Sequence, residues 1–379
     1  MRLHQIDALR GFALFGILIV NIFIFHAPYG HYREFYGAFE GFEAGVVEHM
    51  IFFFGGKMMF IYAFLFGYSF WLQLERKESI ADLRPYWNRR MWVLAGIGIL
   101  HIVFLSFGDI LLPYALLGLL LPFIAHWTNR QLIALFLVVY FIPVYDFLLQ
   151  FFIDYPGFFM SASDPLETYI EANQSGNLVE LFRLRLTDYF SFRNEKLVHY
   201  IPKEFSLFII GILAARMELA KLTATSNALV FFIVALAYTL VMYFFSESIL
   251  GLFNYEEVFF HRILVVLIIH LGEFLQGMCY IVGFFLLWKW GAFRRIATVL
   301  TYSGRLSLTN YLMQSLICVF IFSILGFYAR LKPSQLIYTA VVIYLGQLIF
   351  SYFWLLKYPQ GPMERIWRKL SNQLMKNES

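Results

Sequence analysis

The fold class is decided by continuous apolar runs, and one of them has Ile209-Ile210-Gly211-Ile212-Leu213 at its centre. Strands of a transmembrane barrel alternate apolar and polar side chains over about ten residues, and this run shows no such alternation. A helix needs about 20 predominantly apolar residues to cross the hydrocarbon core of a bilayer. Similar runs recur along the whole chain on both sides of this one. The sequence therefore predicts an all-α integral membrane protein.

The composition supports the same class. The 379 residues are 60% hydrophobic, 20% aromatic and 14% charged, whereas a soluble domain has about 45–50% apolar and about 25% charged residues. This excludes a soluble enzyme, a disordered chain and a disulfide-built secreted module. Cys279 and Cys318 both fall inside apolar runs, where cysteine packs as a small hydrophobe. The net charge of +4 is modest, and we expect membrane lipids rather than nucleic acid as partners.

The apolar runs predict about ten transmembrane helices in a single domain that covers residues 1–379. Their approximate bounds are 9–26, 49–74, 90–107, 110–127, 131–152, 199–216, 226–246, 259–289, 303–327 and 335–356. Lys and Arg concentrate on the cytosolic side of a membrane protein, and an inside N-terminus places roughly twice as many of them there as outside. Both termini are thus predicted to be cytosolic, with residues 357–379 as a basic cytosolic tail. Residues 106–109 should form a tight hairpin turn between the third and fourth spans.

One long outer loop, residues 153–198, is the only substantial segment predicted to lie outside the membrane. Several of its side chains fall at helical spacing: Leu178, Leu181, Phe182, Arg185 and Tyr189. This pattern indicates an amphipathic helix on the outer membrane surface. A plain connector is the alternative interpretation.

Polar side chains inside the predicted spans are the main functional signal, because such groups cost several kcal/mol in a bilayer unless they are paired or hydrated. Asn21 lies eleven residues past Arg10, and His101 lies eleven past Arg90. At 1.5 Å per residue, both sit about 16 Å from the cytosolic edge. Five spans place a polar group near this depth: Asn21, Lys57, His101, His270 and Gln314. Their convergence predicts a water-containing central cavity, although any one buried histidine alone is more often a packing residue.

Two acidic residues extend this set. Glu273 follows His270 at i+3, so it can orient or charge-pair with that imidazole. Asp109 lies in the predicted outer turn, where it positions an acceptor or tethers the turn. The histidines are scattered over separate spans without ligand spacing, so no metal site is predicted.

Arginines recur where predicted helices enter the membrane from the cytosol. Arg10, Arg90 and Arg305 are the three that we assign to binding an anionic group such as the phosphates of coenzyme A. The alternative is that arginines at these positions only anchor the helices in the interface. The sequence contains no Walker loop, Rossmann fingerprint, His-Glu-x-x-His or Cys-x-x-Cys motif.

Four segments of the chain resemble the YeiB-like family, bacterial membrane proteins classed as a domain of unknown function. They are residues 6–14 leading to Asn21; Gly56-Lys57 with residues 65–67; residues 98–101 with residues 108–111 and Tyr114; and residues 304–315, which include Asn310, with residues 361–368. The resemblance implies a multi-pass protein of the bacterial cytoplasmic membrane. It also adds Asn310 to the predicted cavity residues.

YeiB-like proteins are in turn similar to the transmembrane acyltransferases that include heparan-alpha-glucosaminide N-acetyltransferase. Asp7, Arg10 and Gly11 fit the Asp-x-x-Arg-Gly opening of that group, and Asn21 fits its mid-span asparagine. The resemblance implies that acetyl groups pass from cytosolic acetyl-CoA to an acceptor across the membrane. It also implies a catalytic histidine in the first outer loop, for which His26 and His31 are both candidates.

The leading hypothesis is a transmembrane acyltransferase with cytosolic acyl-CoA, bound near the three arginines, as a co-substrate rather than a tightly bound cofactor. His101, or alternatively His31 or His26, acts as the general base on an acceptor hydroxyl or amine, and a covalent acyl-histidine is a variant. Asn21 and Gln314 donate hydrogen bonds to the oxyanion. The acceptor is a small molecule or a glycan.

Two other classes compete with this hypothesis. Lys57, His270 and Glu273 would serve a proton-coupled transporter or permease for a small polar solute. A lipid-binding or partner-organising protein would use the polar layer only to hold helices together. The oligomeric state, a dimer included, is left open by the sequence.

Overall fold

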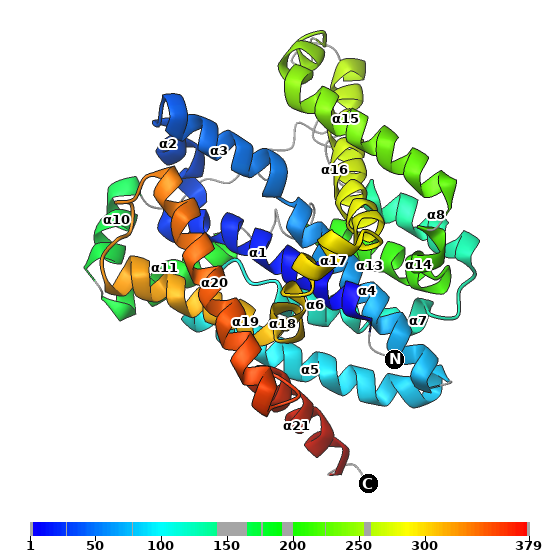
Figure 1. Ribbon diagram of the computed structural model, residues 1–379. Coiled ribbons are helices and arrows are strands. Elements are labelled where there is room, and N and C mark those ends of the chain that lie inside the picture. Colours follow the sequence, from blue (N-terminus) through cyan, green and yellow to red (C-terminus); the bar gives the residue numbers. More distant parts are fainter. Residues whose placement is uncertain are drawn as a thin grey trace.

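The computed structural model describes residues 3–27, 29–77, 79–141, 165–175, 177–191, 200–223, 225–253 and 259–376. All regular structure in these ranges is helical, and they contain no strand. The predicted all-α class is therefore confirmed. Figure 1 shows the helices gathered around α1 and α4, with α5 along one edge and α20 and α21 across one side.

The first half of the chain supplies α1 (His4–His26), η1 (Tyr29–His31), α2 (Tyr32–Gly37), α3 (Gly41–Phe54), α4 (Lys57–Lys77), α5 (Ile80–Phe104), α6 (Leu111–Gly118), α7 (Leu121–Ile124), α8 (Asn129–Tyr140), α10 (Leu166–Gln174) and α11 (Leu178–Ser191). The second half supplies α13 (Ile201–Arg216), α14 (Leu219–Leu222), α15 (Ser226–Leu250), α16 (Phe259–Trp288), α17 (Gly291–Ala297), α18 (Leu300–Arg305), α19 (Ser307–Val319), the π-helical turn η3 (Phe320–Ile324), α20 (Pro333–Lys357) and α21 (Pro362–Lys376).

Six stretches in the described ranges are long and apolar enough to cross a membrane. They are His4–His26, Gly41–Lys77, Ser226–Leu250, Ile263–Trp288, Ser307–Ile324 and Pro333–Lys357. Two further predicted spans correspond to shorter apolar stretches, Leu111–Ile124 and Asn129–Tyr140. Part of the predicted span 131–152 lies outside the described residues. The chain is thus a helical membrane protein, and the number of ten spans stays a prediction.

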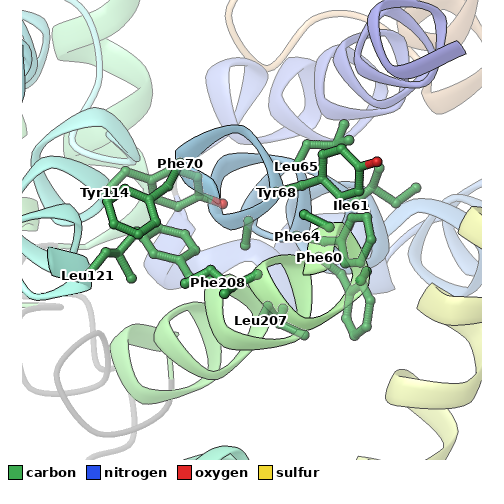
Figure 2. Close-up of a cluster of buried hydrophobic side chains, with 14 of the residues drawn as sticks. Phe60, Ile61, Phe64, Leu65, Tyr68, Phe70, Tyr114, Leu121, Leu207 and Phe208 are labelled. Atoms are coloured by element: carbon green, nitrogen blue, oxygen red, sulfur yellow. The ribbon is translucent and has the colours of Figure 1, made fainter. Parts of the chain in front are cut away.

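Glycines set the closest helix contacts at the centre of the bundle. α4 packs along α13, and a Cβ on Gly67 would lie 1.9 Å from the carbonyl oxygen of Phe208. A Cβ on Gly211 would lie 2.0 Å from the carbonyl oxygen of Phe64. Small residues let two backbones approach this closely in membrane helices. Figure 2 shows the large side chains around the contact, where Phe64 and Phe208 are fully buried between the two helices.

α15 packs against α16, which also contacts α4 and α1, and Figure 1 shows α15 on the outer side of α16. Only 11% of the apolar window in Ser226–Leu250 is buried inside the protein. A helix that is apolar around its whole circumference and still exposed to this degree is typical of a membrane span surrounded by lipid.

The predicted outer loop contains α10 and α11, while residues 153–164, 176 and 192–199 lie outside the described part. α11 covers the segment in which the sequence pattern predicts an amphipathic helix, and it packs against α5. α10 packs against η3. The two helices therefore cover the ends of α5 and η3, and the position of α11 on a membrane surface stays a prediction.

Candidate functional site

His101 is buried between a serine and an aspartate. Its Nε2 lies 2.8 Å from the Oγ of Ser315 on α19, and its Nδ1 lies 2.9 Å from the Oδ1 of Asp109 in the turn after α5. His101 is 2% exposed, Asp109 4% and Ser315 1%. The Nδ1–Oδ1 contact is short but not aligned as a hydrogen bond. The two groups therefore approach within 2.9 Å without forming an aligned hydrogen bond.

The turn between α5 and α6 fixes Asp109. Its second oxygen, Oδ2, accepts a hydrogen bond of 2.7 Å from the backbone N–H of Leu112 at the start of α6. The Oγ of Ser106 accepts one from the N–H of Gly108 inside the turn. The predicted tight hairpin is present, because α5 and α6 pack against each other across this turn. One carboxylate oxygen of Asp109 is thus tethered to the turn, and the other faces His101.

A glycine on α5 makes room for the tethered turn. Gly98 lies about one helical turn before His101, and a Cβ there would come within 2.5 Å of the backbone nitrogen of Leu112 and 3.0 Å of Asp109 Oδ2. Two helices can therefore meet close enough for Asp109 to reach the imidazole. On the opposite side the ring packs against Tyr311, with 5.1 Å between the ring centroids.

Gln314 and Asn310 are buried on α19, but their amides bind α20 and neighbouring backbone instead of His101. The Nε2 of Gln314 donates to Gln347 Oε1 at 3.0 Å, and the Nε2 of Gln347 donates to the carbonyl oxygen of Asn310 at 2.9 Å. Asn310 Nδ2 donates to Ser351 Oγ at 2.9 Å. These contacts favour a role in holding α19 to α20 over the predicted oxyanion role of Gln314.

Lys57, His270 and Glu273 form a separate group where α4, α13 and α16 meet. Glu273 forms an ion pair with Lys203, a residue that the sequence analysis did not select. Lys57 and His270 also interact electrostatically with the Glu273 carboxylate, and His270 Nδ1 lies 2.9 Å from the carbonyl oxygen of Val266. Glu273 therefore has an ion-pair partner on a different helix, Lys203, in addition to its electrostatic interaction with the predicted His270 on its own helix.

The two candidate histidines of the first outer segment have different surroundings. His26 is fully buried; its Nε2 accepts a hydrogen bond of 2.9 Å from the N–H of Leu331, and its Nδ1 lies 3.0 Å from the hydroxyl of Tyr36. With both nitrogens engaged, His26 ties α1 to the segment before α20. His31 Nδ1 lies 2.7 Å from Glu34 Oε2 near the surface.

Asn21 is half-buried on α1. In the part of the chain that the structure describes, none of the hydrogen bonds around His101 involves it. The predicted single central layer is therefore divided among the His101 group, the α19–α20 amides and the lysine–glutamate group.

Two of the three predicted phosphate-binding arginines meet the same segment of α4. Arg10 donates to Ser69 Oγ at 3.0 Å, and Arg90 lies 3.4 Å from Gln73 Oε1, one turn further along. Arg305 donates at 3.4 Å to the carbonyl oxygen of residue 359, where the chain leaves α20. All three lie at the end of the bundle that the sequence assigns to the cytosol.

α21 docks on this arginine-rich end. Trp367 donates to the carbonyl oxygen of Arg90 at 2.8 Å, and the guanidinium of Arg90 stacks over its ring at 4.1 Å. Glu364 accepts hydrogen bonds from the N–H groups of Leu308 and Thr309 and from the Thr309 hydroxyl. Burial raises the pKa of the Glu364 carboxyl above its usual value. The tail thereby caps the first turn of α19, the helix that carries Ser315.

At the opposite end, α10 and α11 cover a cavity of about 60 Å³. It is lined by the end of α1, by the turn after α5, by η3 and by polar groups of the outer helices, among them Arg185 and Asp188. Asp188 accepts a hydrogen bond of 2.7 Å from the hydroxyl of Tyr169, and Arg185 donates to the carbonyl oxygen of Phe104 at 2.6 Å. Burial lowers the pKa of the Arg185 guanidinium. Ser106, in the same turn as Asp109, also lines this cavity.

Sequence reasoning missed Ser315, Lys203 and Asp188, and it placed Arg185 only in the amphipathic pattern of the outer loop. A serine in an apolar run is common, and only its contact with His101 distinguishes Ser315. Within the described ranges, no group of three or more His, Cys, Asp or Glu side chains is arranged to hold a metal ion.

These features define a helical, multi-pass membrane protein with a buried serine–histidine–aspartate group. Residues 211–373 match a family described as "Protein of unknown function (DUF418)". A similar protein from Bacillus subtilis (strain 168), "Uncharacterized protein YxaH", is 24% identical over 97% of this chain and 93% of its own length. Another, "Uncharacterized 39.9 kDa protein in amylase 3'region" of Bacillus acidopullulyticus, is 26% identical over 98% of this chain and 94% of its own.

A third similar protein, "Uncharacterized protein YeiB" of Escherichia coli (strain K12), is 37% identical over 22% of each chain. Together, these matches confirm the YeiB-like relationship that the sequence motifs predict. Their descriptions assign no activity to any of these proteins.

Proposed function

We propose that this protein is a transmembrane acyltransferase that moves an acyl group, most simply acetyl, from cytosolic acyl-CoA to an acceptor on the other side of the bacterial cytoplasmic membrane. The observation that carries the proposal is the placement of His101 between Asp109 and the Ser315 hydroxyl. A buried carboxylate that faces Nδ1 holds an imidazole in the tautomer with a free Nε2 and stabilises the imidazolium that forms during proton transfer. Acyl transfer to a hydroxyl or amine requires such a base.

The two ends of the bundle fit the two substrates. Arg10 and Arg90 present guanidinium groups around one segment of α4, and guanidinium forks suit phosphate oxygens. His101 lies eleven residues beyond Arg90 on the same helix, or about 16 Å along its axis. The extended pantetheine arm of coenzyme A spans a comparable length. On the opposite end, the cavity beneath α10 and α11 offers hydrogen-bonding groups to an acceptor hydroxyl or amine.

Binding of acetyl-CoA to the full-length protein in detergent tests the proposal. Calorimetry should show saturable binding that weakens in Arg10→Ala, while free acetate gives no heat. His101→Ala should retain this binding and lose consumption of acetyl-CoA, because the imidazole acts on protons and not on the phosphates. Absence of binding at millimolar acetyl-CoA in folded protein would refute the acyltransferase.

A second function has its own supporting observation. The ion pair of Lys203 and Glu273, with Lys57 and His270 near the same carboxylate, places four titratable groups on three helices. Such groups mark proton or solute pathways in transporters. Solute uptake into proteoliposomes that depends on a pH gradient and is lost in Glu273→Gln would favour a transporter over the acyltransferase.

A further inference from the structure

We propose that Ser315 is the nucleophile of this site and carries the acyl group covalently on its Oγ between donor and acceptor. The inference deepens the proposed acyltransferase and rests on it for the identity of the acyl donor. In this mechanism the acyl group is bound covalently to a serine between the two substrates. If His101 acted only as a general base on the acceptor, the acyl group would pass directly from donor to acceptor and no covalent intermediate would form.

The contacts of Ser315 fit a serine whose proton is removed by histidine. Its Oγ lies 2.8 Å from His101 Nε2 and 3.4 Å from the carbonyl oxygen of Tyr311 one turn earlier. A buried serine in a helix ordinarily donates to that carbonyl. In the structure the hydroxyl also donates to that carbonyl, but the imidazole nitrogen is the nearer partner. The proposed chemistry uses the tautomer in which the hydroxyl donates to Nε2 and the ring proton is on Nδ1, facing Asp109. The arrangement has the three roles of a nucleophile, a base and an orienting carboxylate.

The depth of Ser315 explains why a covalent carrier is useful here. The stretch Ser307–Ile324 is a candidate membrane span, and Ser315 lies near its middle. Along the helix axis, about 12 Å separate Ser315 from the first residue of the span and about 13 Å from the last. The donor phosphates are expected at the arginine-rich end and the acceptor at the opposite end. An acyl group on a central serine lets the two substrates react in turn.

The reaction balances in two steps. In the first, Ser315 Oγ attacks the thioester carbonyl carbon, a C–O bond forms and the C–S bond breaks. His101 Nε2 takes the serine proton and passes it to the leaving thiolate, which departs as coenzyme A. In the second, the acceptor hydroxyl or amine attacks the acyl-serine carbon, His101 takes its proton, and the proton returns to Ser315 Oγ as the ester bond breaks. No oxidant or reductant is needed.

The outer cavity gives the acceptor a place near this chemistry. Ser106 and Phe107 line the cavity and belong to the short turn that also contains Asp109. α11 packs against α5, and Arg185 of α11 donates to the carbonyl oxygen of Phe104 just before this turn, so the outer helix lies close to it. An acceptor in the cavity would therefore contact the same turn that presents Asp109 to His101.

A fluorophosphonate probe tests Ser315 without knowledge of the acyl donor, because it reacts with activated serines by replacing fluoride with the serine oxygen. Full-length protein in detergent is labelled, digested and examined by mass spectrometry. We expect label on the Ser315 peptide, with Ser315→Ala unlabelled and His101→Ala labelled at least about 100-fold more slowly. Ser351→Ala is the matched control, since Ser351 is a fully buried serine on α20 whose hydroxyl binds Asn310 instead of a histidine. It should be labelled like the wild type.

Incubation with acetyl-CoA distinguishes this inference from the proposed function. An acetyl group on the Ser315 peptide, absent in Ser315→Ala, supports both. Fluorophosphonate label without acetyl-CoA binding supports a nucleophilic Ser315 and removes coenzyme A as the donor. Acetyl-CoA consumption at the full rate in Ser315→Ala would overturn the nucleophilic role of Ser315 while still supporting an acyltransferase. Folded wild type with neither label nor acetyl adduct also overturns the inference.

Discussion

Replacement of Gly98 by alanine is expected to damage the His101 site while His101, Asp109 and Ser315 themselves are unchanged. The new Cβ would lie 2.5 Å from the backbone nitrogen of Leu112, about 0.9 Å inside ordinary van der Waals contact, and 3.0 Å from Asp109 Oδ2. The atom that clashes most closely belongs to the backbone, so no side-chain rotation can relieve the contact. The turn must instead move away from α5 by about 1 Å, at a cost in stability. The present 2.9 Å between His101 Nδ1 and Asp109 Oδ1 then opens towards 4 Å.

Two magnitudes follow from this displacement. Overpacking of a close contact costs about 1–3 kcal/mol of stability. A misplacement of about 1 Å in a catalytic group costs up to about 100-fold in rate. The unfolding temperature in detergent measures the first, and the rate of fluorophosphonate labelling at Ser315, or of acetyl-CoA consumption, measures the second. The rate should fall even at temperatures where Gly98→Ala is fully folded.

Gly96→Ala is the matched control for this prediction. Gly96 lies on the same helix, two residues away, and a Cβ there meets no atom within 4 Å. This variant should keep the wild-type rate and gain up to about 1 kcal/mol from the better helix propensity of alanine. If Gly98→Ala and Gly96→Ala behave alike in both assays, the close approach of the turn to α5 does not maintain the site.

Three further outcomes are expected. Arg305→Ala should weaken acetyl-CoA binding about tenfold, the effect of losing one charge-assisted hydrogen bond. The control is Arg294→Ala, which removes an exposed arginine on α17 and should leave binding unchanged; equal losses of affinity in the two variants would indicate nonspecific attraction. Because burial raises the pKa of Glu364 in the folded protein, its contribution to stability is largest below its unfolded-state pKa and is lost as the pH rises through the folded-state pKa. Glu364→Gln should flatten this part of the stability–pH curve, and an unchanged curve would contradict the raised pKa. Lys203→Met should lower the free energy of unfolding by about 1–3 kcal/mol, because it removes the ion-pair partner of the Glu273 carboxylate. The double variant Lys203→Met with Glu273→Met should recover most of that loss, and a double variant as unstable as the single one would argue against the ion pair.

The helical class and many of the polar positions could be predicted from the sequence. His101 and Asp109 belong to one hairpin whose turn is readable in the chain, so their proximity follows from local structure. The arginine-rich end is also readable, because basic residues cluster where apolar runs begin. The prediction that the polar residues of five spans form one central layer was less accurate. Equal distance from the cytosolic edge places residues at the same depth in the membrane, but it does not determine which helix faces pack together.

Ser315 shows most clearly where sequence reasoning ends. It is 214 residues from its partner His101 in the chain, and it lies beside Gln314, the more conspicuous polar residue. The two side chains leave α19 in directions about 100° apart. One turns towards His101 and the other towards α20, and only the packing of α19 decides which of them faces the imidazole.

By itself, the sequence determined that this chain forms membrane helices, because apolar runs without alternation must satisfy every backbone hydrogen bond internally. It also determined which polar groups those helices carry. Only the tertiary structure decided that His101, among the histidines it describes, meets a serine and a carboxylate. That choice depends on how helices far apart in the chain cross and rotate. The crossings are set by close contacts such as that of Gly67 with the backbone of Phe208, which no local pattern specifies.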